Sequence, residues 1–169
     1  MEHIYLQQAE MKETEAAMHL INEGKQFLKE QGVDQWQTGY PDQKIIREDI
    51  LRKRGFFVTD GVHRFAYLCI DFEGEPAYET LKGEWKSDPV YATIHRMAIS
   101  NVYKGKGISG EIFRLTEELC MKKGVTSIRV DTDEGNAIMR HVLEKNGFGF
   151  RGTIWFENSV KYAYDKVLK

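Results

Sequence analysis

The sequence predicts an α/β domain of three layers built around a mixed β-sheet. Two observations lead to this fold class. In the first half of the chain, two helical segments come before apolar runs that are separated by short turns, which is typical of antiparallel neighbouring strands. In the second half, helices alternate with short β-rich runs, which is typical of parallel neighbours.

The first half contains an alternating polar and apolar start, two stripes of apolar residues at helical spacing, and a turn at Asp60-Gly61 that predicts a hairpin. Gly32 suits the end of the first helix, Asp42 suits the cap of the second, and Gly55 would end that helix. A mixed loop is expected over residues 73–90. The predicted strands cover 3–7, 56–59, 64–72 and 92–99, and the predicted helices cover 10–31 and 42–54.

In the second half, Ile108, Ile112, Leu115 and Leu119 follow one another at the spacing of one helix face. This helix should end near Lys123-Gly124. The remaining predicted elements are strands over 125–130, 148–155 and 161–164 and a helix over 136–145.

Length and composition favour one domain over residues 1–169 in a reducing, cytoplasmic setting. The 24 basic and 26 acidic residues give a net charge of −2, which disfavours binding to nucleic acid. No signal peptide and no membrane-spanning apolar run is evident. Cys69 and Cys120 are far apart, and the histidines lack metal-ligand spacing, so neither a disulfide framework nor a metal site is expected.

The most informative stretch is 97–110, where a predicted strand ends and a glycine-rich turn opens a helix. Glycines permit positive φ, and the free N–H groups of a helix start carry partial positive charge. Lys104 and Lys106 add formal charge. The stretch therefore predicts either a site for a pyrophosphate or simply a tight turn that starts a helix.

One interpretation of this turn is a nicotinamide dinucleotide site in an oxidoreductase. Residues 105–110 match the pattern G-x-G-x-x-G, and Asp131 follows near the position expected for a ribose ligand. However, five residues separate Ile99 from Gly105, whereas the dinucleotide fold places its first glycine almost directly after the strand. The apparent hairpins upstream also fit that fold poorly.

The second interpretation is a resemblance. The run 104–109 is similar to motif A of the GNAT superfamily of N-acyltransferases, Gln/Arg-x-x-Gly-x-Gly/Ala, with departures at Lys104 and Ser109. A second block, which starts at Asn136 and ends in Lys145-Asn146-Gly147-Phe148, resembles the family's Asn…Lys-x-Gly-Phe segment. The resemblance covers a cofactor block of about 92–155. It implies a GNAT-like α/β/α domain whose central sheet is mixed, mostly antiparallel and splayed.

The resemblance also implies acetyl-CoA as co-substrate. The backbone of the strand end would bind the pantetheine arm, and the N–H groups of the glycine-rich turn would bind the pyrophosphate. Asn136 would lie near the arm of the cofactor or serve only as a helix cap. The expected cofactor-binding residues are Met97, Ala98, Ile99, Lys104, Gly105, Lys106, Gly107, Ile108, Ser109, Gly110 and Asn136.

The implied reaction is direct attack of a primary amine on the thioester, which requires a base because alkyl amines are mostly protonated at neutral pH. His95 and Asp131 are the candidates, although either could be an ordinary structural residue. The family's usual acid is a tyrosine seven residues after the asparagine, and here that residue is Leu143. His141 would point to another face of the helix. A catalytically weak CoA-binding or sensor domain therefore remains an alternative.

Two aromatic loops come before the cofactor block and could receive a cationic acceptor amine through cation–π and charge contacts, or could fill the core. The acceptor could be a small molecule or a peptide: a peptide N-terminus, lysine, polyamine, amino sugar and drug all remain open. A homodimer through the C-terminal strand pair is also possible. The candidate acceptor residues are Trp36, Tyr40, Tyr78, Glu79 and Trp85.

Overall fold

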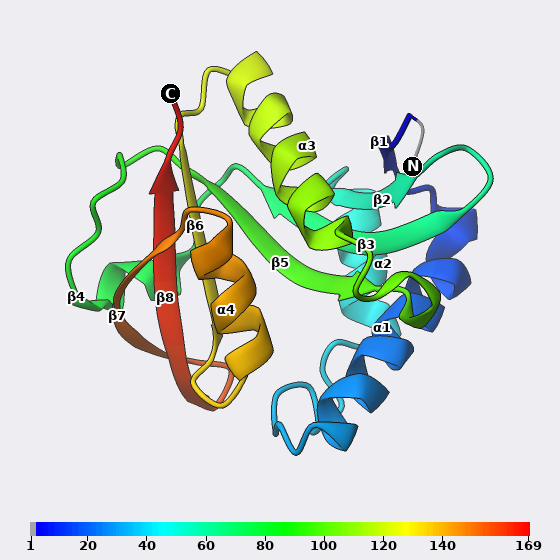
Figure 1. The fold of residues 1–169 in the computed structure, drawn as a ribbon, viewed down its shortest axis with the longest axis horizontal. Helices are drawn as coiled ribbons and strands as arrows, with labels where there is room; N and C mark the ends of the chain where they lie inside the picture. The colour runs from blue at the N-terminus through cyan, green and yellow to red at the C-terminus, as the bar shows by residue number, and fades with distance from the viewer. Residues whose placement is uncertain (1–2) are drawn as a thin grey trace. The chain divides into compact units, whose positions relative to one another are not determined.

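The computed structural model describes residues 3–169, and these form two compact units. The first unit contains the described residues up to Ile70 together with His95–Leu115, and the second contains Asp71–Ile94 and Thr116–Lys169. The fold is mixed α/β, with one mixed sheet in the strand order β1-β2-β3-β5-β6-β8-β7-β4 (Figure 1). The predicted fold class is confirmed.

The strands and helices follow the predicted order, with short additions. The strands are β1 Tyr5–Gln8, β2 Gly55–Thr59, β3 Arg64–Asp71, β4 Lys82–Gly83, β5 Ala92–Ile99, β6 Ser127–Asp133, β7 Gly149–Phe156 and β8 Ser159–Val167. The α-helices are α1 Thr14–Glu30, α2 Gln43–Leu51, α3 Ile108–Lys122 and α4 Ala137–Lys145. The 3₁₀ turns are η1 Met11–Glu13, η2 Pro76–Thr80 and η3 Asn101–Tyr103.

In the first unit, β1, β2 and β3 pair antiparallel, and α1 and α2 share one apolar cluster with β2, β3 and β5. Asp42 caps α2, because its side chain accepts a hydrogen bond from the Ile45 N–H. The helix ends at Leu51 rather than at the predicted Arg54. The reason is that Lys53 adopts a left-handed φ of 59°. The members of the cluster are Ala9, Ala17, Leu20, Ile21, Ile46, Ile50, Phe57, Tyr67 and Ala98.

In the second unit, β8 lies between β6 and β7, and β7 also pairs with the short β4. Strand β5 joins β6 in parallel at Ala92↔Ile128 and Thr93↔Arg129. The dinucleotide alternative is wrong, because that fold has an essentially parallel sheet, whereas β1–β2, β2–β3, β4–β7, β6–β8 and β7–β8 are antiparallel here. Among the described residues, none of the helices has the length and apolar character needed to cross a membrane.

Candidate functional site

The glycine-rich turn lies in the first unit, between β5 and α3. Gly105 and Gly107 have φ values of 77° and 79°, in the left-handed region that favours glycine. A Cβ built on either residue would meet no atom within 4 Å, so the space beside the turn is open. The first N–H groups of α3 also lack acceptors within their own helix. Conformation, space and helix dipole together suit a bound phosphate group.

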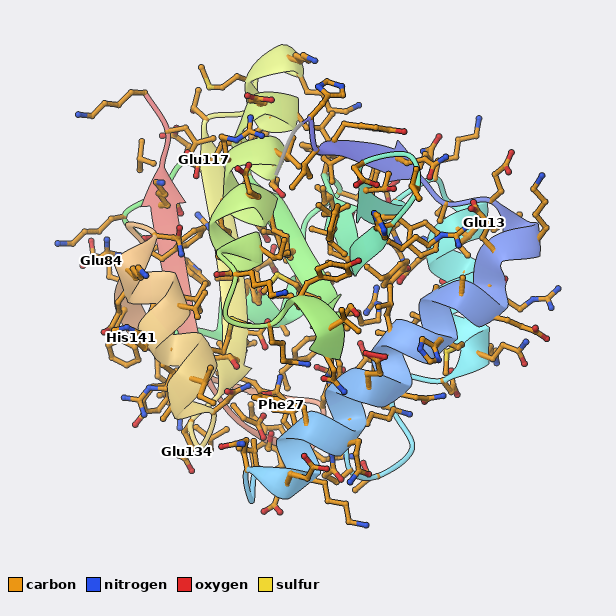
Figure 2. The ribbon with its side chains drawn as sticks, turned by 45° about the vertical axis from the view of Figure 1, so that its right-hand side comes forward. Glu13, Phe27, Glu84, Glu117, Glu134 and His141 are labelled. Carbon is orange, nitrogen blue, oxygen red and sulfur yellow. The ribbon has the colours of Figure 1, made fainter. Side chains whose placement is uncertain are left out.

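The two lysines of the turn have different surroundings. The Lys104 Nζ donates to the Ile99 carbonyl at 3.0 Å and also bonds to the Asn101 side chain. It lies 4.5 Å from the ring centre of Phe27, which α1 contributes (Figure 2). Desolvation by burial lowers the pKa of Lys104. Lys104 therefore binds the end of β5, whereas Lys106 stays exposed beside the turn.

Strand β5 has an irregular backbone just before the predicted pantetheine-binding residues. Arg96 has a φ of 52°, which is unusual for a non-glycine residue inside a strand. A left-handed residue bends the strand and interrupts the alternation of its side chains. In a regular strand His95, Met97 and Ile99 would lie on one face. With Arg96 in the left-handed conformation, this alternation does not hold across it.

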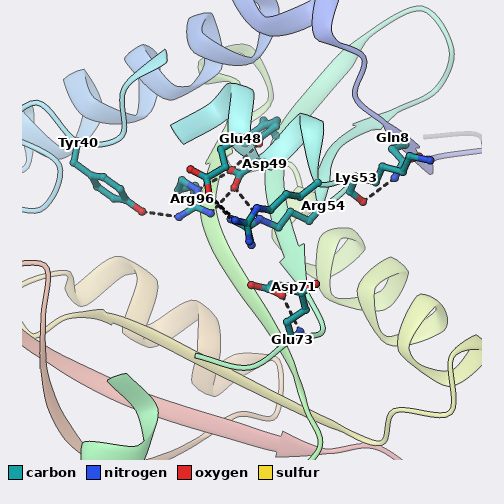
Figure 3. Close-up of polar contacts among 11 residues, drawn as sticks. Gln8, Tyr40, Glu48, Asp49, Lys53, Arg54, Asp71, Glu73 and Arg96 are labelled. Carbon is teal, nitrogen blue, oxygen red and sulfur yellow. Dashed lines mark hydrogen bonds and ion pairs between the residues drawn. The ribbon is translucent and has the colours of Figure 1, made fainter. Parts of the chain in front are cut away.

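A buried carboxylate, Asp49 of α2, holds the Arg96 side chain in this position (Figure 3). The Arg96 Nε and Nη2 donate to its two oxygens at 2.7 and 2.6 Å. The Tyr67 hydroxyl donates to Asp49 at 3.0 Å, and the Arg54 Nε donates to it at 3.2 Å. Asp49 is fully buried, so these bonds replace the water that the charge has lost.

The first aromatic loop contacts β5 within the same unit. The Arg96 Nη1 donates to the Tyr40 hydroxyl at 2.6 Å (Figure 3). Trp36, half-buried, packs against the apolar cluster that includes Ala98. The structure thus brings together two predicted acceptor residues and part of the predicted cofactor strand.

His95 is poorly suited to hold a proton. Burial lowers its pKa to about 3, and the neighbouring Arg96 charge acts in the same direction. The imidazole is therefore neutral at pH 7, and its conjugate acid is far more acidic than a protonated amine.

Asp131 and Tyr78 meet in the second unit. The Tyr78 hydroxyl donates to the Asp131 Oδ1 at 2.6 Å. Burial raises the pKa of Asp131 to about 6, although the Tyr78 hydrogen bond opposes the rise. A carboxyl group with a pKa near neutrality can take up and release a proton in the working range of most enzymes.

The remaining predicted acceptor residues differ in exposure. Tyr78 is buried, and its carbonyl accepts a 2.9 Å bond from the Trp85 Nε1. The Arg129 guanidinium lies 4.6 Å from the Trp85 ring centre and 4.2 Å from that of Tyr91. Tyr78 and Trp85 thus belong to a packed cluster, which agrees with the expectation that these aromatic residues could fill the core. Glu79 is exposed.

The second motif block lies on α4. The Asn136 side chain accepts from the Met139 N–H at 3.1 Å, so this residue caps the helix, and Leu143 is buried with 2% of its surface exposed. His141 lies on the exposed side of α4 (Figure 2). Within residues 3–169, no group of three metal-binding side chains comes together.

The model of the acetyltransferase (GNAT) family matches residues 21–148. The chain belongs to this family. A GNAT acetyltransferase from Streptococcus agalactiae has a TM-score of 0.90 and 29% sequence identity, with 99% of this chain and 97% of that chain covered. For this GNAT chain, no curated protein sequence gives a match.

Two further structures resemble this GNAT chain in fold. A GNAT acetyltransferase from Listeria monocytogenes has a TM-score of 0.76 and 22% identity over 98% of this chain and 95% of that chain. The aminoglycoside acetyltransferase AAC(6')-Ib, solved with ribostamycin and coenzyme A, has a TM-score of 0.71 and 17% identity over 98% of this chain and 94% of that chain.

Sequence reasoning missed Asp49 and Arg96. A signal was present, because Asp49 directly precedes Ile50 in the predicted second helix, where its neighbours Ile46 and Ile50 are apolar. A carboxylate on the apolar side of a helix needs a buried partner. The partner lies 47 residues away, so the sequence did not reveal which residue it was.

Proposed function

We propose that this GNAT protein transfers an acetyl group from acetyl-CoA to the primary amine of a small molecule or peptide. The observation that carries the proposal is the glycine-rich turn at the start of α3, with its two left-handed glycines and the open space beside them. A pyrophosphate needs closely approaching N–H donors more than it needs bulky side chains. The aminoglycoside acetyltransferase crystallised with coenzyme A supports the choice of co-substrate.

The proposed roles of the backbone follow from this choice. The thioester of acetyl-CoA supplies a carbonyl carbon that a neutral amine can attack while the C–S bond breaks. The N–H groups from Gly105 to Gly110 bind the pyrophosphate, and the exposed Lys106 adds charge. The β5 backbone from Met97 to Ile99 hydrogen-bonds the pantetheine arm, and Asn136 is a further cofactor-binding residue in the proposal.

The proposed proton acceptor is Asp131 rather than His95. The attacking amine must lose a proton, and a group with a pKa of about 6 accepts it more readily than one with a pKa of about 3. The leaving thiolate has no acid at Leu143, which is apolar and buried. Since a thiolate is a good leaving group near neutral pH, it can take its proton from water.

The proposed acceptor is a cationic amine. Tyr40 and Trp36 lie on the loop that contacts β5, and Glu79 is exposed on η2. These three residues are the proposed contacts of the amine. Tyr78 instead donates a hydrogen bond to Asp131, and Trp85 packs in the same cluster as Tyr78. The aminoglycosides bound by AAC(6')-Ib are amines of this kind.

Calorimetric titration with acetyl-CoA tests the proposal, with NADH titrated in parallel. We expect micromolar binding of acetyl-CoA only. Thiol release is then followed with kanamycin, spermidine and a lysine-containing peptide as acceptors. If acetyl-CoA does not bind, the proposed function is wrong.

A second candidate is a CoA-binding domain with weak catalysis. The buried Leu143 at the position of the usual acid favours it. Binding of acetyl-CoA without thiol release for any amine in a broad panel would select this alternative.

A further inference from the structure

We propose that Asp49 is a positioning residue for acetyl transfer, an inference that rests on the proposed function. Its carboxylate holds Arg96 in the left-handed conformation and so fixes two parts of the site at once. The first is the β5 backbone at Met97, and the second is the aromatic loop that carries Tyr40.

The Arg96 backbone needs such a restraint. A left-handed conformation costs a non-glycine residue roughly 1–2 kcal/mol. Without a compensating contact, Arg96 would relax toward an ordinary extended conformation. That change would rotate the following peptide unit, which leads into Met97, one of the proposed pantetheine-binding residues.

The contact between Asp49 and Arg96 has the geometry of a strong restraint. Two nitrogens of one guanidinium meet two oxygens of one carboxylate at 2.6 and 2.7 Å. Such bidentate pairs fix orientation as well as distance. Asp49 is fully buried and the Arg96 side chain is only 8% exposed, so solvent competes little for these bonds.

The same guanidinium extends the restraint to the loop. The remaining nitrogen, Nη1, donates to the Tyr40 hydroxyl. The loop is held a second time by Trp36, which packs on the cluster that contains Ala98. Movement of Arg96 would therefore disturb the proposed acceptor side and the proposed cofactor side together.

Four variants separate positioning from plain stabilisation. Asp49→Asn keeps the shape of the side chain and removes its charge. Arg96→Gly allows the left-handed conformation without any restraint, and the double variant combines the two changes. Tyr67→Phe is the matched control. It also removes a hydrogen bond to Asp49, but it leaves the bonds from Arg96 to Asp49 and to Tyr40 in place.

Amide hydrogen exchange is the first measurement, since it needs no acceptor. In Asp49→Asn we expect exchange at Met97–Ile99 and in loop 36–40 to be about tenfold faster than in Tyr67→Phe. Equal exchange in the two variants would overturn the proposal. Should Asp49→Asn not fold, Tyr40→Phe tests the hydrogen bond between Arg96 and the loop. Amide exchange in loop 36–40 should then become faster while exchange at Met97–Ile99 stays unchanged. Unchanged exchange in the loop would contradict the proposed restraint.

Turnover with acetyl-CoA and the best acceptor among kanamycin, spermidine and the lysine-containing peptide is the second measurement. Asp49→Asn should lower kcat at least about tenfold, because small displacements of reacting groups are costly. In the Arg96→Gly background the same change should alter kcat less than about twofold, since Asp49 then has no conformation to hold. Equal losses in both backgrounds would show a merely structural role. A wild-type protein that does not bind acetyl-CoA would instead refute the proposed function, and the exchange result would still report on the restraint.

Discussion

Burial acts in opposite directions on the two candidate bases, and this difference assigns their roles. The neutral form of an imidazole is favoured by desolvation, so the pKa of His95 falls to about 3. The neutral form of a carboxyl group is favoured by the same effect, so the pKa of Asp131 rises to about 6. Of these two groups, only Asp131 has a pKa close to neutral pH.

The first prediction concerns Asp131→Asn. Above pH 6 the wild-type carboxylate is deprotonated and can accept a proton, so the rate should rise as the pH passes through about 6. The variant should lack this rise and lose about 10²- to 10⁴-fold in kcat, the usual contribution of a general base. Initial rates from pH 5 to 8 with the best acceptor measure both effects. His95→Gln is the comparison variant. A larger loss of kcat in His95→Gln than in Asp131→Asn would make His95, and not Asp131, the proton acceptor.

Single residues could be predicted from the sequence, but their partners could not. Asp131 was a candidate because it ends a β-rich run, near where some members of the resembled family place an acidic base, whereas its partner Tyr78 lies 53 residues earlier. Periodicity reports only local neighbours. Likewise, no local pattern indicated that Lys104 would bind the end of β5 rather than remain exposed like Lys106.

At the level of elements, periodicity predicted the four α-helices and most strands. It missed β4, which has only two residues, and it missed η2 in the loop over 73–90. Elements this short contain too few repeats of an apolar pattern for the pattern to be recognised. Strand β6 extends three residues beyond its predicted end at Val130, because backbone pairing with β8 continues through polar residues to Asp133.

The glycine-rich turn can be tested against a matched control, because a similar glycine lies at the other end of α3. Gly107 precedes the helix and Gly124 follows it, with φ values of 79° and 72°, and a Cβ at either would meet open space. Alanine at either position should therefore lower the free energy of unfolding by a similar amount, about 1–2 kcal/mol. Only Gly107→Ala should also weaken acetyl-CoA binding. Denaturant unfolding and calorimetry measure the two effects, and equal acetyl-CoA affinities would argue against a phosphate site at the turn.

For the whole molecule, the sequence predicted a mixed sheet but not the place of each strand in it. The C-terminal strand pair was offered as a homodimer contact, yet β8 lies between β6 and β7. Strand order depends on long-range pairing, which turn signals and local patterns do not encode. A homodimer remains a prediction, and any such contact could not pair with the backbone of β8.

Stability should depend on the buried Asp165. Its oxygens accept bonds from the Arg151 Nε at 2.5 Å and from the N–H groups of Lys86 and Ser87 at 2.8 Å. Burial alone would raise the pKa of Asp165, but these bonds outweigh it and lower the pKa. The stabilisation is therefore complete above the unfolded-state pKa of about 4 and is lost as the pH falls through the lower folded-state value.

Asp165→Asn should accordingly reduce the free energy of unfolding by about 3–5 kcal/mol at pH 7, because it leaves the Arg151 charge without its partner. The difference from wild type should shrink as the pH is lowered. Glu117→Gln, at the half-buried pair with Lys166, should cost no more than about 1 kcal/mol. Urea unfolding at pH 7 and pH 3 measures these values, and similar losses in the two variants would contradict the assignment.

The link between Arg96 and Tyr40 also bears on protein engineering. Loops are commonly exchanged between related enzymes to alter what they accept. Here the loop around Tyr40 is anchored by a strand residue and, through it, by a helix residue, Asp49. If this loop were moved into a related enzyme, these two residues would need to move with it. A library that varied the loop here without keeping Tyr40 would lose the hydrogen bond to Arg96.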